Sequence, residues 1–306
     1  MKNNLFENEG SIFMGSQRSQ NNSTVGIFGV NYDGTTSYKP GTRFGPEAIR
    51  NASQSLETYC PQLKKDLEEI EYADFGALSI DLNNSKDVIE KVKIGTKFII
   101  SNKLKPLLLG GEHSITSGAI DALVPKYPNL IVIQLDAHAD LRESYLNNKY
   151  SHACSMRRCL EVLPMKTIFQ IGIRSGTKDE FQQMHERKQL INFNAGDKNN
   201  LLKETLEPFK KYPIYLTIDL DWFDPSLLSG TGTPEPGGFF WRDFQTIIEV
   251  LNQFQIIGAD IVELSPDLDP SGVSSVVAAK VARSLIMILD KTSCKELIYI
   301  KYKINF

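Results

Sequence analysis

The stretch LIVIQLDAHAD, which runs from Leu130 to Asp140, decides the fold class and points to the chemistry of the chain. Its first half is almost wholly apolar and rich in β-branched residues, as expected of a strand buried on both faces of a parallel sheet. Its second half places Asp136, His138 and Asp140 at alternate positions, so an extended backbone points the three side chains to one face. A polar strand end in solvent would explain each residue alone, but the three together indicate a cation between them.

Short apolar runs like this one recur along the chain, with segments of helical spacing between them. The runs expected to be strands are 25–30, 71–75, 105–109, 129–135, 167–173, 214–220, 256–262 and 297–302. The segments expected to be helices are 46–59, 86–102, 155–162, 178–188, 242–254 and 274–291, with Pro46 in a first turn and Ser274 as a cap. This alternation predicts an α/β fold with a mostly parallel sheet of about eight strands, covered by helices on both faces.

One domain is expected over residues 1–306, because the sequence has no internal repeat and no Pro/Ser-rich linker. Residues 1–23, rich in Asn, Ser and Gln, are expected to form an extended N-terminal arm. With 41% apolar residues the chain can bury a sizeable core, and a net charge of -3 gives no field for binding nucleic acid or an anionic membrane. A small molecule is therefore the expected partner.

The location of the protein is suggested by what the sequence lacks. The first residues have neither the basic start nor the apolar stretch of a secretory signal, and no apolar run is long enough to cross a bilayer. Cys60, Cys154, Cys159 and Cys294 show no paired spacing, which fits a reducing compartment and buried or unreactive thiols. A cytoplasmic protein is expected.

Two further motifs follow predicted strands. Asp219 and Asp221 again alternate, and two like charges held close raise each other's pKa unless a positive charge lies between them. That pair alone fits a metal site and a solvated loop equally well. Gly110 and Gly111 let the backbone turn sharply and deliver His113 at the end of another strand, which by itself would be an ordinary strand-to-helix turn.

Parallel strands end at one edge of a sheet, which is where such sheets bind ligands. The ligand-type residues expected to meet there are His113, Asp136, His138, Asp140, Asp219 and Asp221. Four carboxylates and two imidazoles balance two divalent ions, and an oxygen-rich set without thiolate favours Mn²⁺, or Fe²⁺ or Co²⁺, over structural Zn²⁺. Two such ions can share a water, lower its pKa and supply hydroxide at neutral pH, so hydrolysis is the expected use.

The ordered set of motifs resembles the ureohydrolase family of arginases and agmatinases over residues 26–291. The segments that carry the resemblance are 41–50, 110–114, 136–140, 151–152, 219–225, 230–238 and 260–266. The resemblance implies a three-layer α/β/α fold of the arginase and deacetylase type, in which hydroxide attacks a guanidinium carbon. It also implies a homo-oligomer, either a trimer or a hexamer.

The resemblance further implies which residues bind metal and which act on the substrate. It implies two Mn²⁺ per subunit, one held by His113, Asp136, Asp140 and Asp219, the other by Asp136, His138, Asp219 and Asp221, so that Asp136 and Asp219 bridge. Asp140 also counts as catalytic, together with Glu263, which would grip the guanidinium through paired hydrogen bonds, and His152, which would move protons near the leaving amine. The alternative for Glu263 is a pair with a nearby basic side chain, but its position on the metal-bearing sheet favours the functional role. Without the resemblance, His152 would be expected to lie on the surface.

Agmatine is the expected substrate, with putrescine and urea as products. A pocket for arginine must bind an α-amino and an α-carboxylate group, and two features that serve this purpose in arginases are absent from segments 147–152 and 175–177. Guanidinobutyrase, formimidoylglutamase and arginase are the alternatives within the family. The first two would need a cation for the distal carboxylate of the substrate, for which Arg142, Lys149 and Arg157 are candidates.

Two other classes share the fold type. A zinc-dependent deacetylase would use one metal ion and fewer carboxylates, and a non-catalytic metal-binding member would be marked by a lost ligand, whereas none is lost here. Other conspicuous residues are expected to be structural. These are His185 on the surface, Arg157 and Arg158 as solvated helix charges, and Trp222 and Trp241 as core or rim packing.

Overall fold

A nine-stranded sheet forms the centre of the structure, a computed structural model that describes residues 5–7, 10–18, 22–81, 84–193 and 198–290. Its strands are β1 (Phe6–Glu7), β2 (Val25–Val30), β5 (Tyr72–Leu78), β6 (Lys105–Gly110), β7 (Ile131–Leu135), β8 (Ile168–Ile171), β9 (Leu190–Ile191), β10 (Pro213–Asp219) and β11 (Gln255–Val262). They lie in the order β1-β5-β2-β6-β11-β10-β7-β8-β9, and every pairing in this sheet except that of β1 with β5 is parallel. Two further strands, β3 (Tyr59–Cys60) and β4 (Lys65–Asp66), form a small antiparallel pair.

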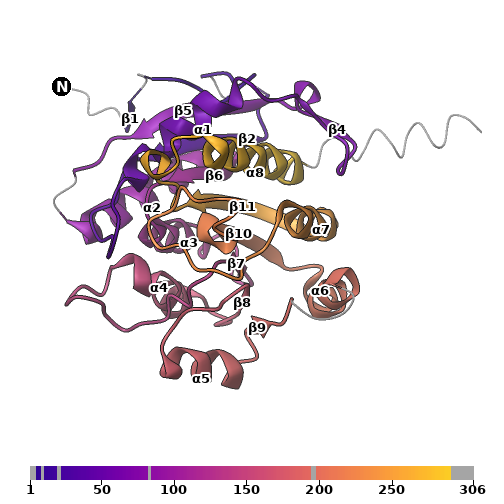
Figure 1. Ribbon diagram of the computed structural model, residues 1–306. Coiled ribbons are helices and arrows are strands. Elements are labelled where there is room, and N and C mark those ends of the chain that lie inside the picture. The colour runs from indigo at the N-terminus through magenta and orange to yellow at the C-terminus, as the bar shows by residue number, and fades with distance from the viewer. Residues whose placement is uncertain (1–4, 8–9, 19–21, 82–83, 194–197, 291–306) are drawn as a thin grey trace, which may run out of the picture.

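Helices cover both faces of the sheet, which gives three layers (Figure 1). They are α1 (Gly45–Ser53), α2 (Ser85–Ser101), α3 (Thr116–Leu123), α4 (Ser155–Val162), α5 (Lys178–Glu186), α6 (Lys198–Leu206), α7 (Trp241–Leu251) and α8 (Val273–Leu289). Buried side chains of α1, α6, α7 and α8 share one apolar core with the sheet, and those of α2, α3, α4 and α5 share a second. The predicted α/β fold with a mostly parallel, doubly covered sheet is confirmed.

Strand β7 shows why the central strands are apolar without interruption. Ile131 and Ile133 lie in one core, and Val132 between them lies in the other. Because successive side chains point to opposite faces and both faces are covered, each position has to be apolar. Each such side chain contributes about 1.5–3 kcal/mol when it is fully buried.

Seven of the eight predicted strands are present, with ends that differ by a few residues. The predicted strand 297–302 lies outside the described residues. Strands β1 and β9 were not predicted, because each has two residues and therefore no alternation pattern to detect. Helices α3 and α6 were also missed. In α3 nearly every side chain is buried, so the segment lacks the polar face that marks a helix in a sequence.

Two local predictions are wrong. The helix expected over 46–59 ends at Ser53, because residues beyond it form β3 and offer the carbonyls of Glu57 and Tyr59 to Nη1 of Arg283 on α8. Ser274 does not cap α8, whose N-cap is Gly272. Its backbone N–H and its hydroxyl both donate to Asp269 Oδ2, so Asp269 takes the role expected of Ser274.

The described part of the N-terminal segment lies along β5. Phe6 and Glu7 pair with β5 as strand β1, Gln17 forms a bridge with Ala73, and Phe13 is fully buried. The predicted organisation into one domain with an extended arm stays a prediction. Among the described residues, no helix combines the length and the apolar character needed to cross a membrane.

The thiols within the described residues fit the sequence-based expectation. Cys60, Cys154 and Cys159 are free and buried, and burial raises the pKa of Cys154 to about 11, which makes the thiol unreactive. Cys294 lies outside the described residues. The cytoplasmic location stays a prediction.

A buried ion pair between Arg50 on α1 and Asp74 on β5 holds the N-terminal segment in place. Asp74 accepts hydrogen bonds from Nε and Nη2 of Arg50, at 2.8 and 2.9 Å, and from the backbone N–H of Phe13 at 2.9 Å. Both charged side chains are almost fully buried. Removing one partner therefore leaves the other charge buried without compensation.

We expect Asp74→Ala to lower the free energy of unfolding by about 3–5 kcal/mol, because Arg50 would stay buried without its carboxylate. The matched control is Asp121→Ala, which removes only a more exposed pair with Lys93 and should cost less than about 1 kcal/mol. Urea unfolding followed by circular dichroism measures both. Losses of equal size would contradict the assignment of Asp74 as a buried anchor.

Candidate metal centre

The ligand-type residues and Glu263 lie at the carboxyl ends of four strands that are neighbours in the middle of the sheet. Strands β6, β11, β10 and β7 are adjacent in that order and parallel, so their carboxyl ends meet at one edge. Gly111 makes the turn after β6 possible, because a Cβ atom there would lie 1.8 Å from the carbonyl oxygen of Tyr32. The turn leads into a single 3-10 turn that begins at His113.

A first group of side chains surrounds the ring of His113. Its Nδ1 atom lies 3.0 Å from Asp136 Oδ2, 3.1 Å from Asp140 Oδ2 and 3.3 Å from Asp219 Oδ2. His113, Asp136 and Asp140 are all buried and hold their donor atoms close enough together to bind a metal ion. Nδ1 is nevertheless a buried atom without a hydrogen bond in the structure.

A second group lies beside the first. Nδ1 of His138 is 2.8 Å from Asp221 Oδ2 and 3.7 Å from Asp136 Oδ1. Asp136, His138 and Asp221 also have the spacing of metal ligands, so Asp136 belongs to both groups. Asp219 contacts the first group directly, and its Oδ1 accepts a hydrogen bond from the backbone N–H of Asp221 at 2.9 Å. The structure thus brings together all six predicted ligand residues.

Two of the predicted site residues adopt left-handed backbone conformations. Asp140 has a φ of 54° and Glu263 has a φ of 66°, values that residues other than glycine rarely adopt. Each such residue costs on the order of 1–3 kcal/mol, which the surrounding structure must supply. The strain turns each carboxylate toward the edge of the sheet where the other ligands lie.

The electrostatics of the cluster show a shortage of positive charge. Burial, together with Asp221 and Asp140, raises the pKa of Asp136 to about 7, and burial with Asp221 raises the pKa of Asp219 well above its ordinary value. Burial lowers the pKa of His138, but the neighbouring carboxylates, Asp221 foremost, outweigh it and raise the pKa to about 11. The side chains thus hold protons where no cation separates them.

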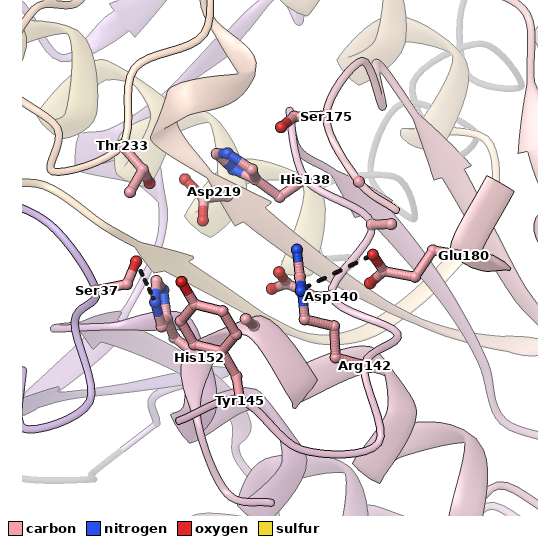
Figure 2. A pocket seen from close by; sticks show the side chains of 13 residues that line it. Ser37, His138, Asp140, Arg142, Tyr145, His152, Ser175, Glu180, Asp219 and Thr233 are labelled. Carbon is pink, nitrogen blue, oxygen red and sulfur yellow. Dashed lines mark hydrogen bonds and ion pairs between the residues drawn. The ribbon is translucent and has the colours of Figure 1, made fainter. Parts of the chain in front are cut away.

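A cavity of about 250 Å³ opens onto the cluster. His138, Asp140 and Asp219 line it together with Ser37, Tyr145, His152 and Thr233, and Figure 2 shows how these side chains lie around it. Ser37 and Tyr145 were not predicted from the sequence, because single hydroxyl side chains in loops carry no recognisable pattern. Thr233 belongs to segment 230–238, one of the segments that carry the family resemblance.

His152 lines this cavity, and Glu263 lies beside its ring. His152 Nδ1 is 3.5 Å from Glu263 Oε1, and the same oxygen accepts a hydrogen bond from the backbone N–H of His113 at 2.8 Å. On the other side of the ring, Nε2 is 3.2 Å from Ser37 Oγ. Burial lowers the pKa of His152, but the contact with Glu263 outweighs it and raises the pKa to about 9. The contact with Glu263 therefore favours the protonated form of His152.

Comparison with known proteins identifies this arrangement. The model of the arginase family matches residues 23–288. The chain belongs to the arginase family. It is similar to an agmatinase of Bacillus anthracis, with 36% identity over 280 residues, 91% of this chain and 96% of the relative. It is also similar to an N(1)-aminopropylagmatine ureohydrolase of Thermococcus kodakarensis, with 38% identity over 81% of this chain and 86% of the relative. The crystal structure of an agmatine ureohydrolase of Thermoplasma volcanium superposes with a TM-score of 0.80 at 32% identity, over 90% of this chain and 93% of the other.

The chain is therefore a ureohydrolase with an arginase-like fold, and its two ligand groups fit the binuclear centre of the family. The fit rests on two features. Nδ1 of His113 is a buried nitrogen that faces three carboxylates without a hydrogen bond, and the shared carboxylate of Asp136 lies between the two groups. Oxygen and imidazole donors without thiolate suit Mn²⁺ and similar ions.

The loop at residues 230–238 is fastened to the second ligand group by Arg174. The guanidinium donates to the carbonyl oxygens of Asp221 at 2.6 Å and Glu235 at 2.8 Å. Thr233 on this loop lies 3.4 Å from Asp221 Oδ2. The turn that carries Asp221 and the wall of the cavity therefore form one connected unit.

The residues expected to be structural have mixed outcomes. His185 is exposed, and Trp222 is fully buried and stacked on Phe239, as expected. Arg158 is not a solvated charge, because its side chain is only 7% exposed and forms an ion pair with Glu161 at 2.9 Å. Its stem lies on the buried side of α4, which the alternation of charges in the sequence does not show.

Of the three basic residues considered for a distal carboxylate, Arg142 lines the cavity. Its guanidinium lies over the ring of Tyr145, 5.0 Å from the centroid, and its Nε atom is 3.9 Å from Glu180 Oε2 (Figure 2). Lys149 lies over Tyr150, and Arg157 pairs with Glu143. Neither Lys149 nor Arg157 is among the residues that line the cavity.

We expect Mn²⁺ binding to weaken as the pH falls from 8 to 6. Metal binding needs anionic carboxylates and neutral imidazoles, whereas the raised pKa values of Asp136 (about 7) and His138 (about 11) mean that these groups hold protons in the metal-free protein. Binding must release those protons, so the affinity changes by about tenfold per pH unit for each proton released. Calorimetric titration in two buffers of different protonation enthalpy measures the release, and a pH-independent affinity would contradict it.

We expect Asp219→Asn to separate the stability of the metal-free protein from its response to metal. Because the pKa of Asp219 is raised on burial, folding without metal must protonate this carboxylate, whereas asparagine needs no proton, so the melting temperature without metal should equal or exceed that of the wild type. The rise in melting temperature on adding Mn²⁺ should be largely lost, since a bound ion stabilises only the form that holds it. Thermal unfolding with and without Mn²⁺ tests this, and an undiminished rise would remove Asp219 from the set of ligands.

Proposed function

We propose that the chain is an agmatinase, which hydrolyses agmatine to putrescine and urea with two Mn²⁺ per subunit. The observation that carries the proposal is that His138, Asp140 and Asp219 from the two ligand groups line one cavity with His152, whose ring lies beside Glu263. Similarity to proteins named agmatinase and agmatine ureohydrolase supports the choice of substrate. A cytoplasmic homo-oligomer, a trimer or a hexamer, is part of the same proposal.

The proposed ligands are those of the two groups, with Asp219 added to both and with Asp136 and Asp219 shared. When bound, two divalent ions lower the pKa of a water and supply hydroxide as the nucleophile at neutral pH. Asp140, which lines the cavity, is proposed both as a ligand and as a carboxylate that faces the reacting group. The left-handed backbone at Asp140 fixes its carboxylate in that direction.

Glu263 is proposed to orient the guanidinium group. A carboxylate accepts two parallel N–H bonds from a planar guanidinium and so fixes the position of the carbon between them. Glu263 is itself held in place, because Oε1 accepts the backbone N–H of His113 and its own backbone N–H donates to Gly111 O at 2.8 Å. Glu263 would thereby position the substrate carbon relative to the same strand ends that carry the ligands.

His152 is proposed to donate the proton that the leaving amine needs. An amine leaves poorly from carbon unless it is protonated, and an imidazolium within reach supplies the proton. The contact with Glu263 favours the protonated form of His152, as the raised pKa of about 9 indicates. Ser37 and the hydroxyl of Thr35, which accepts the backbone N–H of His152 at 2.9 Å, hold the residue at the cavity wall.

A guanidino acid hydrolase, such as a guanidinobutyrase, is the second candidate, and Arg142 in the cavity wall is the observation that favours it. A cation there would attract a distal carboxylate and repel the distal ammonium of agmatine. Agmatine remains the preferred substrate because Arg142 is already compensated by the buried carboxylate of Glu180 and the ring of Tyr145. The name of the Thermococcus kodakarensis relative makes N(1)-aminopropylagmatine a third compound to assay.

We expect the metal-loaded protein to release urea from agmatine faster than from guanidinobutyrate, N(1)-aminopropylagmatine or arginine. Release should require Mn²⁺ and should disappear in Asp136→Asn, because Asp136 belongs to both ligand groups. A urea assay at equal substrate concentrations measures this. Faster turnover of guanidinobutyrate would replace the substrate, and unchanged activity in Asp136→Asn would overturn the proposed centre.

We expect His152→Asn to reduce kcat by about 10²–10⁴-fold, the usual contribution of a general acid. In Glu263→Gln the cause of the raised pKa of His152 is lost, so the pKa should fall and the alkaline limb of the rate profile should move to lower pH. His185→Asn, a change at an exposed histidine of α5, is the control and should leave the profile unchanged. An unshifted alkaline limb in Glu263→Gln would remove His152 as the titrating acid.

A further inference from the structure

A buried carboxylate in the interior of the sheet has no role in the centre as described so far. Asp260 lies within β11 and is fully buried, and no basic side chain of the described residues forms an ion pair with it. Three hydroxyl groups donate to it instead. They are Tyr215 at 2.8 Å and Thr116 at 2.9 Å, both to Oδ2, and Thr217 at 2.6 Å to Oδ1. An isolated carboxylate is costly to bury, so three directed donors around one indicate that its charge is used.

Thr217 connects this carboxylate to the candidate ligand His113. Its Oγ1 atom lies 2.9 Å from His113 Nε2. The Thr217 hydroxyl has one hydrogen, and a carboxylate can only accept, so that hydrogen points to Asp260. Thr217 must then accept from His113, which places a proton on Nε2.

The direction of this chain of hydrogen bonds decides which ring nitrogen can bind metal. With the proton on Nε2, the lone pair of Nδ1 is free and faces Asp136, Asp140 and Asp219. A reversed chain would put the proton on Nδ1 and block the site. The other candidate imidazole has no such support, since Nε2 of His138 lies 3.7 Å from Glu235 on a partly exposed loop.

We propose that Asp260, acting through Thr217, is a positioning residue that fixes the tautomer and the ring orientation of His113 and so increases the affinity of the His113 group for its metal ion. The proposal rests on the metal centre of the proposed function but not on the identity of the substrate. Thr116 and Tyr215 hold Asp260 without contacting the ring of His113. They therefore serve as internal references for effects that arise only from disturbing the core.

The test compares Thr217→Val with Thr217→Ser. Valine has the shape of threonine without the hydroxyl and suits a strand, whereas serine keeps the hydroxyl. Metal-free protein is titrated with Mn²⁺, and the signal of free Mn²⁺ in electron paramagnetic resonance counts the ions that remain unbound. We expect Thr217→Val to lower the binding affinity for one of the two ions by about 10–100-fold, the usual effect of losing a hydrogen bond to a ligating histidine. Thr217→Ser should bind both ions nearly as the wild type does.

Two further variants make the result specific. Thr116→Val removes a hydroxyl that donates to Asp260 and lies 3.4 Å from Thr217 Oγ1. It keeps the Thr217 hydroxyl that contacts the His113 ring, so its effect on affinity should be clearly smaller than that of Thr217→Val. In Asp260→Asn the side-chain amide can donate to Thr217 and reverse the direction of the hydrogen bonds. The affinity for the same ion should therefore fall at least as much as in Thr217→Val. Melting temperatures of the metal-free variants confirm that each one folds.

Unchanged affinity for both ions in Thr217→Val would overturn the proposal, and so would equal losses in Thr217→Val and Thr116→Val. The titration contains no substrate, so its outcome does not depend on whether agmatine is the substrate. A wild-type protein that releases no urea from agmatine but loses one ion selectively in Thr217→Val would refute the agmatinase assignment and support the role of Asp260.

Discussion

Mutual repulsion among buried carboxylates is the constraint on which the rest of the structure depends. Asp136, Asp140, Asp219 and Asp221 are all largely buried within a few ångströms of two imidazoles, and burial together with the neighbouring carboxylates raises the pKa values of Asp136 and Asp219. Repulsion between their charges would drive such side chains apart. The two apolar cores that clamp the sheet supply the free energy that holds them together, and a metal pair turns the repulsion into attraction.

The parallel order of the central strands answers this constraint geometrically. Four neighbouring strands end at one edge, so each contributes only one to three residues at or just beyond its carboxyl end. Some of these residues reach the site only through an unusual backbone conformation. Asp140 and Glu263 reach the site through left-handed backbone, and the glycine at 111 lets β6 turn within contact of Tyr32. These positions are costly individually, and the rigid sheet around them makes the cost tolerable.

The sequence predicts the metal-binding residues better than the residues that line the substrate cavity, and the reason is physical. Ligands such as Asp219 and Asp221 lie at strand ends, where alternation along an extended backbone is visible in the order of residues. Ser37 and Tyr145 lie in loops whose position depends on the whole fold, and Thr217 finds its partner His113 more than a hundred residues away. Helix α3 escaped detection for a related reason, since burial on all sides removes the periodic signal. Similarity to relatives has the same limit, because proteins named for different guanidino substrates resemble this chain to about the same degree.

The polar groups inside the sheet show how such a site can be prepared before metal arrives. Gln170 donates through Nε2 to Gln134 Oε1 at 2.6 Å, and Gln134 donates in turn to Asp136 Oδ2 at 2.6 Å. The other oxygen of Asp136 accepts the backbone N–H of His138, also at 2.6 Å. Each oxygen therefore has one hydrogen bond that fixes its direction and a further lone pair that remains for a cation. Asp260 and Thr217 do for the imidazole of His113 what this pair of glutamines does for Asp136. Two chains of hydrogen bonds thus run through the otherwise apolar sheet to the ligand groups. Burying their polar groups costs free energy, but a centre whose ligands are already oriented loses less entropy on binding metal.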